Sequence, residues 1–303
     1  MGSKIVHAGL VLAIVSVGIA QDQAKPTTEA VSLVTFYAMG DVPYAPEEDV
    51  LLPQQITELP KDAEFVIHVG DIKSGAPPCD EAVYKKVSGM LSQAVAPVFI
   101  IPGDNEWNDC LIPDPEQAWK YWDKYFMRFD RRWQHQLPVF RQLEHEENFS
   151  FVKGNVLFVG LNIVGGRVHD AVEWKQRHAD GLDWVRRNLR RSGANVSSLV
   201  IFGHAKPAAN HSDFFDPFNQ DAEEFKKPIL YLHGDGHRWI HDRPFAAKNI
   251  LRVEVDQGGI APPLKVTVTD DPTDPFQFDR RKPEPEPRPP KLGKLKGCPE
   301  DTR

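Results

Sequence analysis

The sequence predicts an α/β fold, and three observations support this prediction. Short apolar runs rich in β-branched and aromatic residues alternate along the chain with longer segments of helical length. Such alternation favours sheets that are covered by helices. Several predicted strands also end in a glycine-bearing loop with an acid or a histidine, and ligand sites of α/β sheets lie at strand ends of this kind.

The individual elements follow from the spacing of the apolar residues. In the third predicted helix, Leu182, Val185 and Leu189 fall on one face, whereas the arginines fall largely on others. The predicted helices cover residues 82–94, 115–128, 174–191 and 214–227. The predicted strands cover residues 31–39, 65–69, 98–101, 156–164, 199–202, 229–232, 251–255 and 264–268.

Composition and charge narrow the possible functions. The chain of 303 residues is 41% hydrophobic and 26% charged, which is ordinary for a protein with a buried core. Its net charge of −7 argues against a nucleic-acid binder, because such proteins usually carry a basic domain or stripe. An anionic substrate would therefore need a local source of positive charge.

The N-terminal segment is predicted to be a signal peptide over residues 1–20. Lys4 precedes an apolar run over residues 8–20 that ends in small residues, as signal peptides do. The run is too short to span a bilayer comfortably, and an uncleaved membrane anchor is the alternative interpretation. We therefore expect a secreted or periplasmic protein with no stable membrane insertion after cleavage.

The rest of the chain divides into a domain and a tail. Residues 21–269 contain all the predicted strands and helices. Residues 270–303 are rich in proline and charge and have almost nothing apolar to bury. We expect a disordered tail whose removal leaves the melting temperature nearly unchanged.

The three cysteines are informative if the protein is exported, because disulfides persist in oxidising compartments. Cys79 and Cys110 each follow one of the acidic loops described next, so a bridge between them would tie two of those loops together. Two free buried thiols are the alternative. Cys298 then stays unassigned in the predicted tail.

Five predicted strands end in loops that carry an acid or a histidine. One Gly-Asp pair after a strand would indicate only a turn, but five such loops together indicate a site. Carboxylates gathered at one edge of a sheet repel one another unless a multivalent cation holds them ionised. The residues are Asp41 in AMGDVPY, Asp71 in HVGDIKSG, Asp104 in PGDNEW, His204 in IFGHAKP, and Asp235 and His237 in YLHGDGHRW.

These residue types predict a metal site. Carboxylate and imidazole ligands suit Mn, Fe, Mg or Zn, and the lack of thiolates argues against a sulfur site. One or two divalent or trivalent ions would also supply the positive charge that an anionic substrate needs. The identity of the metal stays open at this point.

The order of the five motifs resembles the calcineurin-like metallophosphoesterase superfamily, which includes the purple acid phosphatases. The family pattern runs D-x-H, G-D-x-x-[DY], G-N-H-[DE], an isolated histidine, and G-H-x-H. The resemblance extends from residue 31 to about residue 269. It implies a two-sheet β-sandwich flanked by helices, in four layers.

The resemblance also implies two metal sites that share Asp71. The first would use Asp41, Asp71 and His237, and the second would use Asp71, Asp104, His204 and Asp235.

This sequence departs from the family pattern at the first site. Pro43 replaces the histidine of D-x-H, and Ser74 replaces the tyrosine or aspartate three residues after Asp71. The first site therefore lacks one protein ligand. Water, Ser74 or Tyr44 could fill the gap, and weak occupancy of that site is the alternative.

The second site is more acidic than the family pattern. Asp104 replaces an asparagine, and Asp235 replaces a histidine. An oxygen-rich, anionic ligand set favours Mn²⁺, Mg²⁺, Ca²⁺ or Fe³⁺ over Zn²⁺.

A third departure concerns the acid that protonates the leaving group. Asn105 stands where the family has a histidine, and an amide donates a hydrogen bond but has no proton to release near neutral pH. His233 and His211 are candidates for the acid, or metal chemistry alone suffices. Lys73 is a candidate to hold a phosphate oxygen, or it is a solvated loop lysine. Glu106 either orients a ligand or caps a helix.

Through the resemblance, the sequence indicates a hydrolase that cleaves a small phosphate ester with a metal-activated hydroxide. Lys73 favours a monoester, because a terminal phosphate benefits from added positive charge. The alternatives are a phosphodiesterase or nucleotidase of the same fold, and a catalytically silent relative that binds metal or anion.

Overall fold

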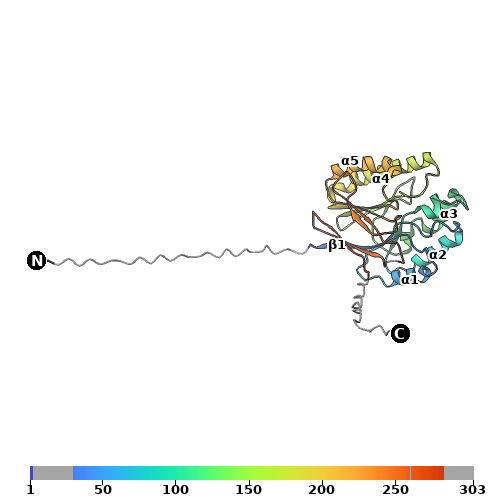
Figure 1. Cartoon of the computed structure of the whole chain (residues 1–303), viewed down its shortest axis with the longest axis horizontal. Coiled ribbons are helices and arrows are strands. Elements are labelled where there is room, and N and C mark those ends of the chain that lie inside the picture. The colour runs from blue at the N-terminus through green and yellow to red at the C-terminus, as the bar shows by residue number, and fades with distance from the viewer. Residues whose placement is uncertain (3–29, 260, 283–303) are drawn as a thin grey trace, which may run out of the picture. The chain divides into compact units, whose positions relative to one another are not determined.

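The computed structural model describes residues 1–2, 30–259 and 261–282. The predicted signal peptide, apart from its first two residues, lies outside this part of the chain, as does Cys298. Two mixed sheets form the centre of the domain, and helices cover their outer faces (Figure 1). The predicted fold class is therefore confirmed.

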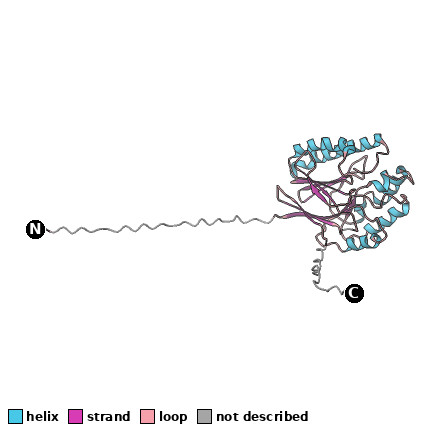
Figure 2. Ribbon diagram, viewed as in Figure 1, coloured by secondary structure: helices cyan, strands magenta, loops and turns pink. Residues whose placement is uncertain are grey.

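The first sheet has the strand order β12-β11-β1-β2-β3, with β1, β2 and β3 parallel (Figure 2). This sheet packs against three helices, α1 (Glu48–Thr57), α2 (Glu81–Leu91) and α3 (Pro115–Phe126). The strands are β1 (Ser32–Met39), β2 (Val66–His68), β3 (Val98–Ile100), β11 (Leu264–Thr269) and β12 (Phe276–Asp279).

The second sheet has the order β4-β5-β6-β7-β8-β10-β9, with β6, β7, β8 and β10 parallel. Helices α4 (Ala171–Ser192) and α5 (Ser212–Phe225) cover its outer face. The strands are β4 (Phe140–Arg141), β5 (Phe149–Lys153), β6 (Val156–Gly160), β7 (Ser198–Phe202), β8 (Ile229–His233), β9 (Ile240–Asp242) and β10 (Ile250–Glu254).

Alternation of side chains along the strands builds the layers. In β7, Val200 and Phe202 enter the core between the sheets, whereas Leu199 and Ile201 pack under the outer helices. Both faces of the strand are buried, so it reads as a continuous apolar run. Phe65 and Phe36 stack with ring centroids 4.9 Å apart in the same core.

All eight predicted strands and all four predicted helices form, with small shifts at their ends. Helix α1 was not predicted, because Pro53 lies inside it and prolines usually end helices. Strands β4, β5, β9 and β12 were also not predicted. Three of them have four residues or fewer, and polar residues interrupt their apolar pattern.

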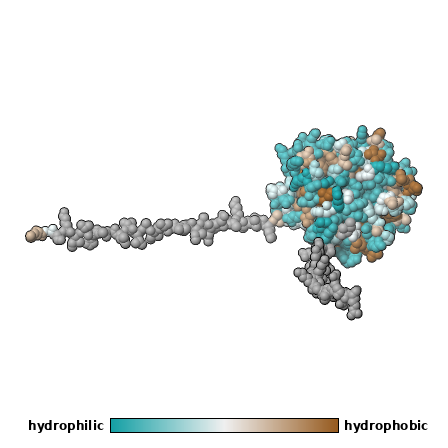
Figure 3. Space-filling model, in the orientation of Figure 1, coloured by the Kyte–Doolittle hydropathy of each residue, from teal (hydrophilic) through white to brown (hydrophobic). Residues whose placement is uncertain are grey.

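The described part of the surface that is visible in Figure 3 has no large continuous hydrophobic patch. On the face in Figure 3, hydrophobic residues are scattered among hydrophilic ones. Among the described residues, no helix combines the length and the apolar character that a membrane crossing requires.

Regular structure extends beyond the boundary predicted at residue 269. Residues Phe276–Asp279 form β12 and pair antiparallel with β11, and Phe276 is buried against the core between the sheets. Beyond the strand, Arg280 and Lys282 pair with Asp256 at 2.7 and 3.0 Å. An edge strand of four residues, flanked by proline and charge, has too weak a pattern to be seen in the sequence.

Truncation should distinguish the strand from the tail. Ending the chain at Asp270 removes the buried Phe276 side chain, which contributes about 1.5–3 kcal/mol, and should lower the melting temperature by several degrees. Ending it after Lys282 removes no described contact and serves as the control. Equal melting temperatures of the two truncated proteins in a calorimetric scan would contradict the docking of β12.

A disulfide joins Cys79 and Cys110, as the sequence suggested. The bond links the loop after β2 to the loop after η1 (Asp104–Asn108), a single π-helical turn. Both sulfur atoms lie near the carbonyl oxygen of Asn105, at 3.4 and 3.7 Å. The covalent link therefore holds two strand-end loops against each other.

The sequence separation of 31 residues determines how much this disulfide stabilises the folded protein. Replacing both cysteines with alanine should lower the free energy of unfolding by roughly 3–4 kcal/mol, because the unfolded chain regains loop entropy. Urea denaturation measures the loss. Thiol titration of the unfolded, unreduced protein should detect Cys298 alone, and a count of three thiols would show that the bond does not form.

Candidate metal centre

The predicted ligands lie where the parallel strands of both sheets end. Backbone pairing aligns Met39 with His68 and His68 with Ile100, so β1, β2 and β3 end at the same level. Their loops therefore emerge at one edge of the sheet. Asp41 follows β1, Asp71 follows β2, Asp104 opens η1 after β3, His204 follows β7, and Asp235 and His237 follow β8.

Five of the six predicted ligands form two overlapping triads. Asp41, Asp71 and His204 make up one, and Asp104, His204 and Asp235 make up the other, each with ligand atoms within 4.8 Å of one another. His204 is common to both triads. The sequence had instead grouped Asp41 and Asp71 with His237, whose Nε2 atom lies 3.4 Å from Asp41 Oδ1 and whose side chain is 44% exposed.

The hydrogen bonding of His204 suits a metal ligand. Its Nδ1 atom lies 2.8 Å from the carbonyl oxygen of Val69, which accepts a hydrogen bond but cannot donate one. The neutral ring therefore carries its proton on Nδ1 and presents the Nε2 lone pair to the centre. Nε2 faces Asp104 Oδ1 at 2.9 Å and Asp71 Oδ1 at 3.4 Å.

Several buried atoms at the centre have no hydrogen-bond partner among the described residues. They are Asp41 Oδ2, and Asp104 Oδ1 and His204 Nε2, which lie 2.9 Å apart without hydrogen-bond geometry. A buried carboxylate oxygen without a partner is unfavourable, because it has lost its water and gained nothing in exchange. These atoms fit a bound cation, which would satisfy all of them at once.

The shifted pKa values of Asp71 and His204 also reflect the crowding of buried charge at the centre. Burial raises the pKa of Asp71 well above its ordinary value, and Asp104 and Glu106 add to the increase against the opposing effect of His204. Burial lowers the pKa of His204, but Asp71 and Asp104 together raise it well above its ordinary value. Without a cation the cluster therefore retains protons that metal binding would displace.

Strained backbone positions the ligands. Asp41, Asp71, Asp235 and His237 have φ angles of 55°, 61°, 75° and 61°, in the left-handed region that costs residues with a side chain roughly 1–3 kcal/mol each. Gly103 is needed for close approach, because a Cβ atom there would lie 2.2 Å from the backbone nitrogen of Asp71. Such strain concentrates at functional sites.

Residues 35–239 match the model of the calcineurin-like phosphoesterase family. The chain belongs to this family. The match covers all five strand-end loops, so the resemblance inferred from the motifs is confirmed. No significant match was found among curated proteins.

Two solved structures support the fold of this calcineurin-like phosphoesterase. A purple acid phosphatase from yellow lupin (Lupinus luteus) seeds is 12% identical, with a TM-score of 0.50 over 78% of this chain and 49% of its own. A 5'-nucleotidase from Candida albicans is 13% identical, with a TM-score of 0.50 over 82% of this chain and 51% of its own. The chain thus spans about half the length of each.

Tyr44 occupies the gap that the sequence left at the first site. Its hydroxyl donates to Asp71 Oδ2 at 2.6 Å and lies 3.3 Å from Asp41 Oδ1 and 3.4 Å from His237 Nε2. Of the three alternatives for this gap, the structure thus brings Tyr44 to the centre. Its spacing of three residues from Asp41 is the only sign of this role in the sequence.

Asn105 and Lys73 hold the loop at the centre. The side-chain amide of Asn105 donates to Asp71 Oδ2 and to the Tyr44 hydroxyl, the latter at 3.2 Å. Lys73 is buried, and its Nζ atom donates to the carbonyl oxygen of Asn105 at 2.9 Å. Lys73 is therefore not a solvated loop lysine, and its contacts stabilise the position of Asn105.

Two buried glutamates support the ligand loops. Glu106 Oε1 accepts from the backbone nitrogens of Gly103 at 2.6 Å and Asp71 at 3.1 Å, so it both closes the turn of η1 and orients a ligand loop. Glu254 Oε1 accepts from Arg238 N beside the Asp235 loop. Glu254 was not among the predicted site residues, although an acid within the apolar run 251–255 is unusual.

The two histidines considered as acids are buried in the fold. His233 is 0% exposed, and burial lowers its pKa to about 3, so its ring is neutral near neutral pH and is a poor proton donor. His211 is also buried, with Nε2 2.9 Å from the carbonyl oxygen of Val164. Neither belongs to the two triads, and these positions do not favour a role for either in protonating a leaving group.

The Tyr44 hydroxyl should contribute to metal binding. Tyr44→Phe removes its contacts with Asp71 and Asp41 and should lower the affinity for Mn²⁺ by roughly 10–100-fold, as measured by isothermal titration calorimetry. Tyr125→Phe is the matched control, because that hydroxyl donates to Glu81 at 2.9 Å, away from the centre. Unchanged affinity in Tyr44→Phe would exclude the contribution.

Proposed function

We propose that the protein is an exported, metal-dependent phosphoesterase that hydrolyses small phosphate monoesters. The proposal rests on the convergence of buried ligand atoms from Asp41, Asp104 and His204, which have no hydrogen-bond partner among the described residues, at the strand ends of this fold. The disulfide supports export, because such bonds persist in oxidising compartments. The apolar run over residues 8–20 supports it independently.

The chain offers enough ligands for one or two ions. The ions would be held by the residues of the two triads, which are Asp41, Asp71, Asp104, His204 and Asp235. His237 and Tyr44 lie beside the triad that contains Asp41. Mn, Fe, Mg and Ca suit the oxygen-rich set better than Zn. A bound ion supplies a Lewis acid for a phosphoryl oxygen and lowers the pKa of a water molecule.

The chain's own groups orient the ligands. Asn105 donates to Asp71 and Tyr44, which keeps both side chains turned toward the centre. Because Asn105 has no proton to release, we expect fast turnover only for leaving groups that need none, such as aryl oxides.

A cavity of about 340 Å³, lined in part by Tyr44, could accommodate the leaving group. Pro43, Ile72, Lys73 and Ser74 also line it. Lys73 retains ammonium protons beyond the one that it donates to Asn105, and it supplies positive charge on the side where a terminal phosphate would lie. This charge favours a monoester over a diester.

One observation favours a catalytically silent relative as the second candidate. The position that supplies an acid in the family pattern holds Asn105, whose amide is engaged with Asp71. A protein of this kind would bind metal for stability or recognition and would turn over neither ester class.

The first experiment measures metal content together with hydrolysis of p-nitrophenyl phosphate and bis(p-nitrophenyl) phosphate. Mn²⁺, Mg²⁺, Ca²⁺ and Zn²⁺ are added separately. We expect metal-dependent turnover that is faster for the monoester. Asp71→Asn should lower kcat/KM by at least roughly a hundredfold, because it removes a charge that holds the metal.

Asp216→Asn is the matched control, because Asp216 is exposed on α5, and it should leave turnover and metal content unchanged. Retained metal and activity in Asp71→Asn would refute the ligand assignment. Bound metal without turnover of either ester by the unaltered protein would reject the enzyme and leave the silent relative.

A further inference from the structure

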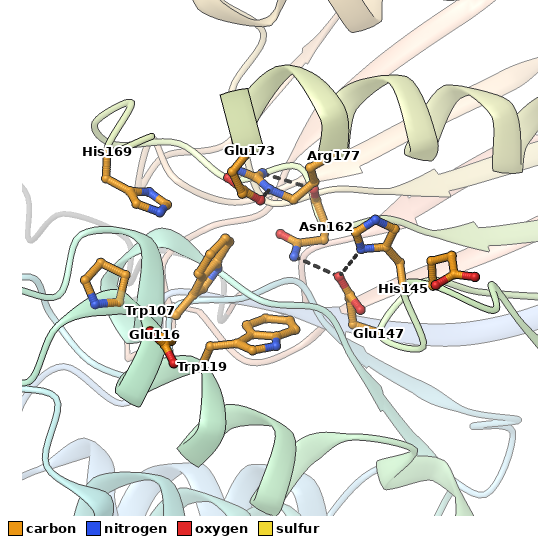
Figure 4. Close-up of a pocket in the computed structure, with 11 residues that line it drawn as sticks. Trp107, Glu116, Trp119, His145, Glu147, Asn162, His169, Glu173 and Arg177 are labelled. Atoms are coloured by element: carbon orange, nitrogen blue, oxygen red, sulfur yellow. Dashed lines mark hydrogen bonds and ion pairs between the residues drawn. The ribbon is translucent and has the colours of Figure 1, made fainter. Parts of the chain in front are cut away.

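The chain has a second cavity, which Figure 4 shows with its lining residues. Its volume is about 360 Å³, and it opens between η1, α3, α4 and the turn that joins β4 to β5. None of the predicted metal ligands lines it. The proposed phosphoesterase activity therefore leaves this cavity without a role.

Two indole rings form one wall of the cavity. Trp107 and Trp119 lie with ring centroids 5.0 Å apart at an angle of 60°, and Figure 4 shows both side chains turned toward the same space. The Arg177 guanidinium lies 5.0 Å from the centre of the Trp107 ring and pairs with Glu173. The two tilted rings therefore form an apolar corner, and a planar ring can pack against either indole.

The opposite wall presents a buried acceptor that has no donor. Asn162 is 3% exposed, and its Nδ2 donates to Glu147 Oε1 at 3.1 Å, but its Oδ1 has no hydrogen-bond partner among the described residues. Leaving such a group unpaired is unfavourable, because the oxygen has lost its water and has gained no donor. A ligand N–H at this position would supply that donor.

The charge around the cavity is negative. Four glutamates line it, against Arg177 and His145 as the cationic partners. Glu173 is paired with Arg177, and buried Glu147 contacts His145 at 3.3 Å. Glu144 is exposed at the cavity and forms no ion pair with another described residue. An anion such as a phosphate ester is disfavoured here, and a cation is favoured.

We propose that this cavity binds a small protonated primary amine that carries an aromatic ring. The ring lies against Trp107 and Trp119. The ammonium group donates one N–H to Asn162 Oδ1, and Glu144 supplies a negative charge that no cation among the described residues neutralises. The site shares no residue with the two triads of the metal centre.

The test uses 2-phenylethylamine as the probe, with the full-length protein at neutral pH in a titration calorimeter. We expect saturable one-to-one binding. The neutral 2-phenylethanol should bind at least tenfold more weakly, because it lacks the charge. The N,N,N-trimethyl derivative should bind at least fivefold more weakly, because it has no N–H for Asn162. No saturable binding of the amine, or equal binding of the alcohol, would overturn the proposal.

Variants locate the site. Glu144→Gln should weaken binding of the amine at least fivefold, whereas Glu223→Gln, an exposed glutamate on α5, should leave it unchanged. Trp119→Leu should weaken it at least tenfold, with circular dichroism to verify the fold. Unchanged affinity in both Glu144→Gln and Trp119→Leu would place the amine elsewhere and refute the site. Binding is measured without hydrolysis, so the result is independent of the phosphoesterase activity.

Discussion

The arrangement of the strand-end loops depends on the crowding of buried charge around His204. Asp41, Asp71 and Asp104 are all buried within reach of that imidazole. Like charges in a site of low polarity oppose one another, so such a cluster needs either protons or a cation. A cation bound here would relieve this repulsion and would thereby also stabilise the fold.

The surrounding structure keeps the cluster together despite its cost. Glu106 accepts from the backbone of Gly103 and Asp71, and Lys73 donates to the carbonyl of Asn105. The disulfide joins the same two loops covalently. This explains the PGDNEW stretch, in which the first acid faces the centre, the amide orients Asp71 and the second acid holds the loop.

Prediction from sequence worked best for strands that are buried on both faces. Strand β7 packs one set of side chains between the sheets and the other under α4 and α5, so its apolar run is unbroken. Edge strands such as β12 bury only single residues, here Phe276, and their pattern is too short to detect. Helix α1 was not predicted because Pro53 lowers the local preference for a helix. Tertiary packing overrides this preference in the folded protein.

The sequence by itself determined the types of the predicted ligands, their order and the edge of the sheet where they gather. Gly-Asp and Gly-His turns that follow strands are local features, so they can be recognised from neighbouring residues alone. Only the tertiary structure decided that His204 serves both triads, that Tyr44 reaches the centre and that His233 is buried. These features depend on how loops from different strands pack against one another, and spacing along the chain carries no information about such packing.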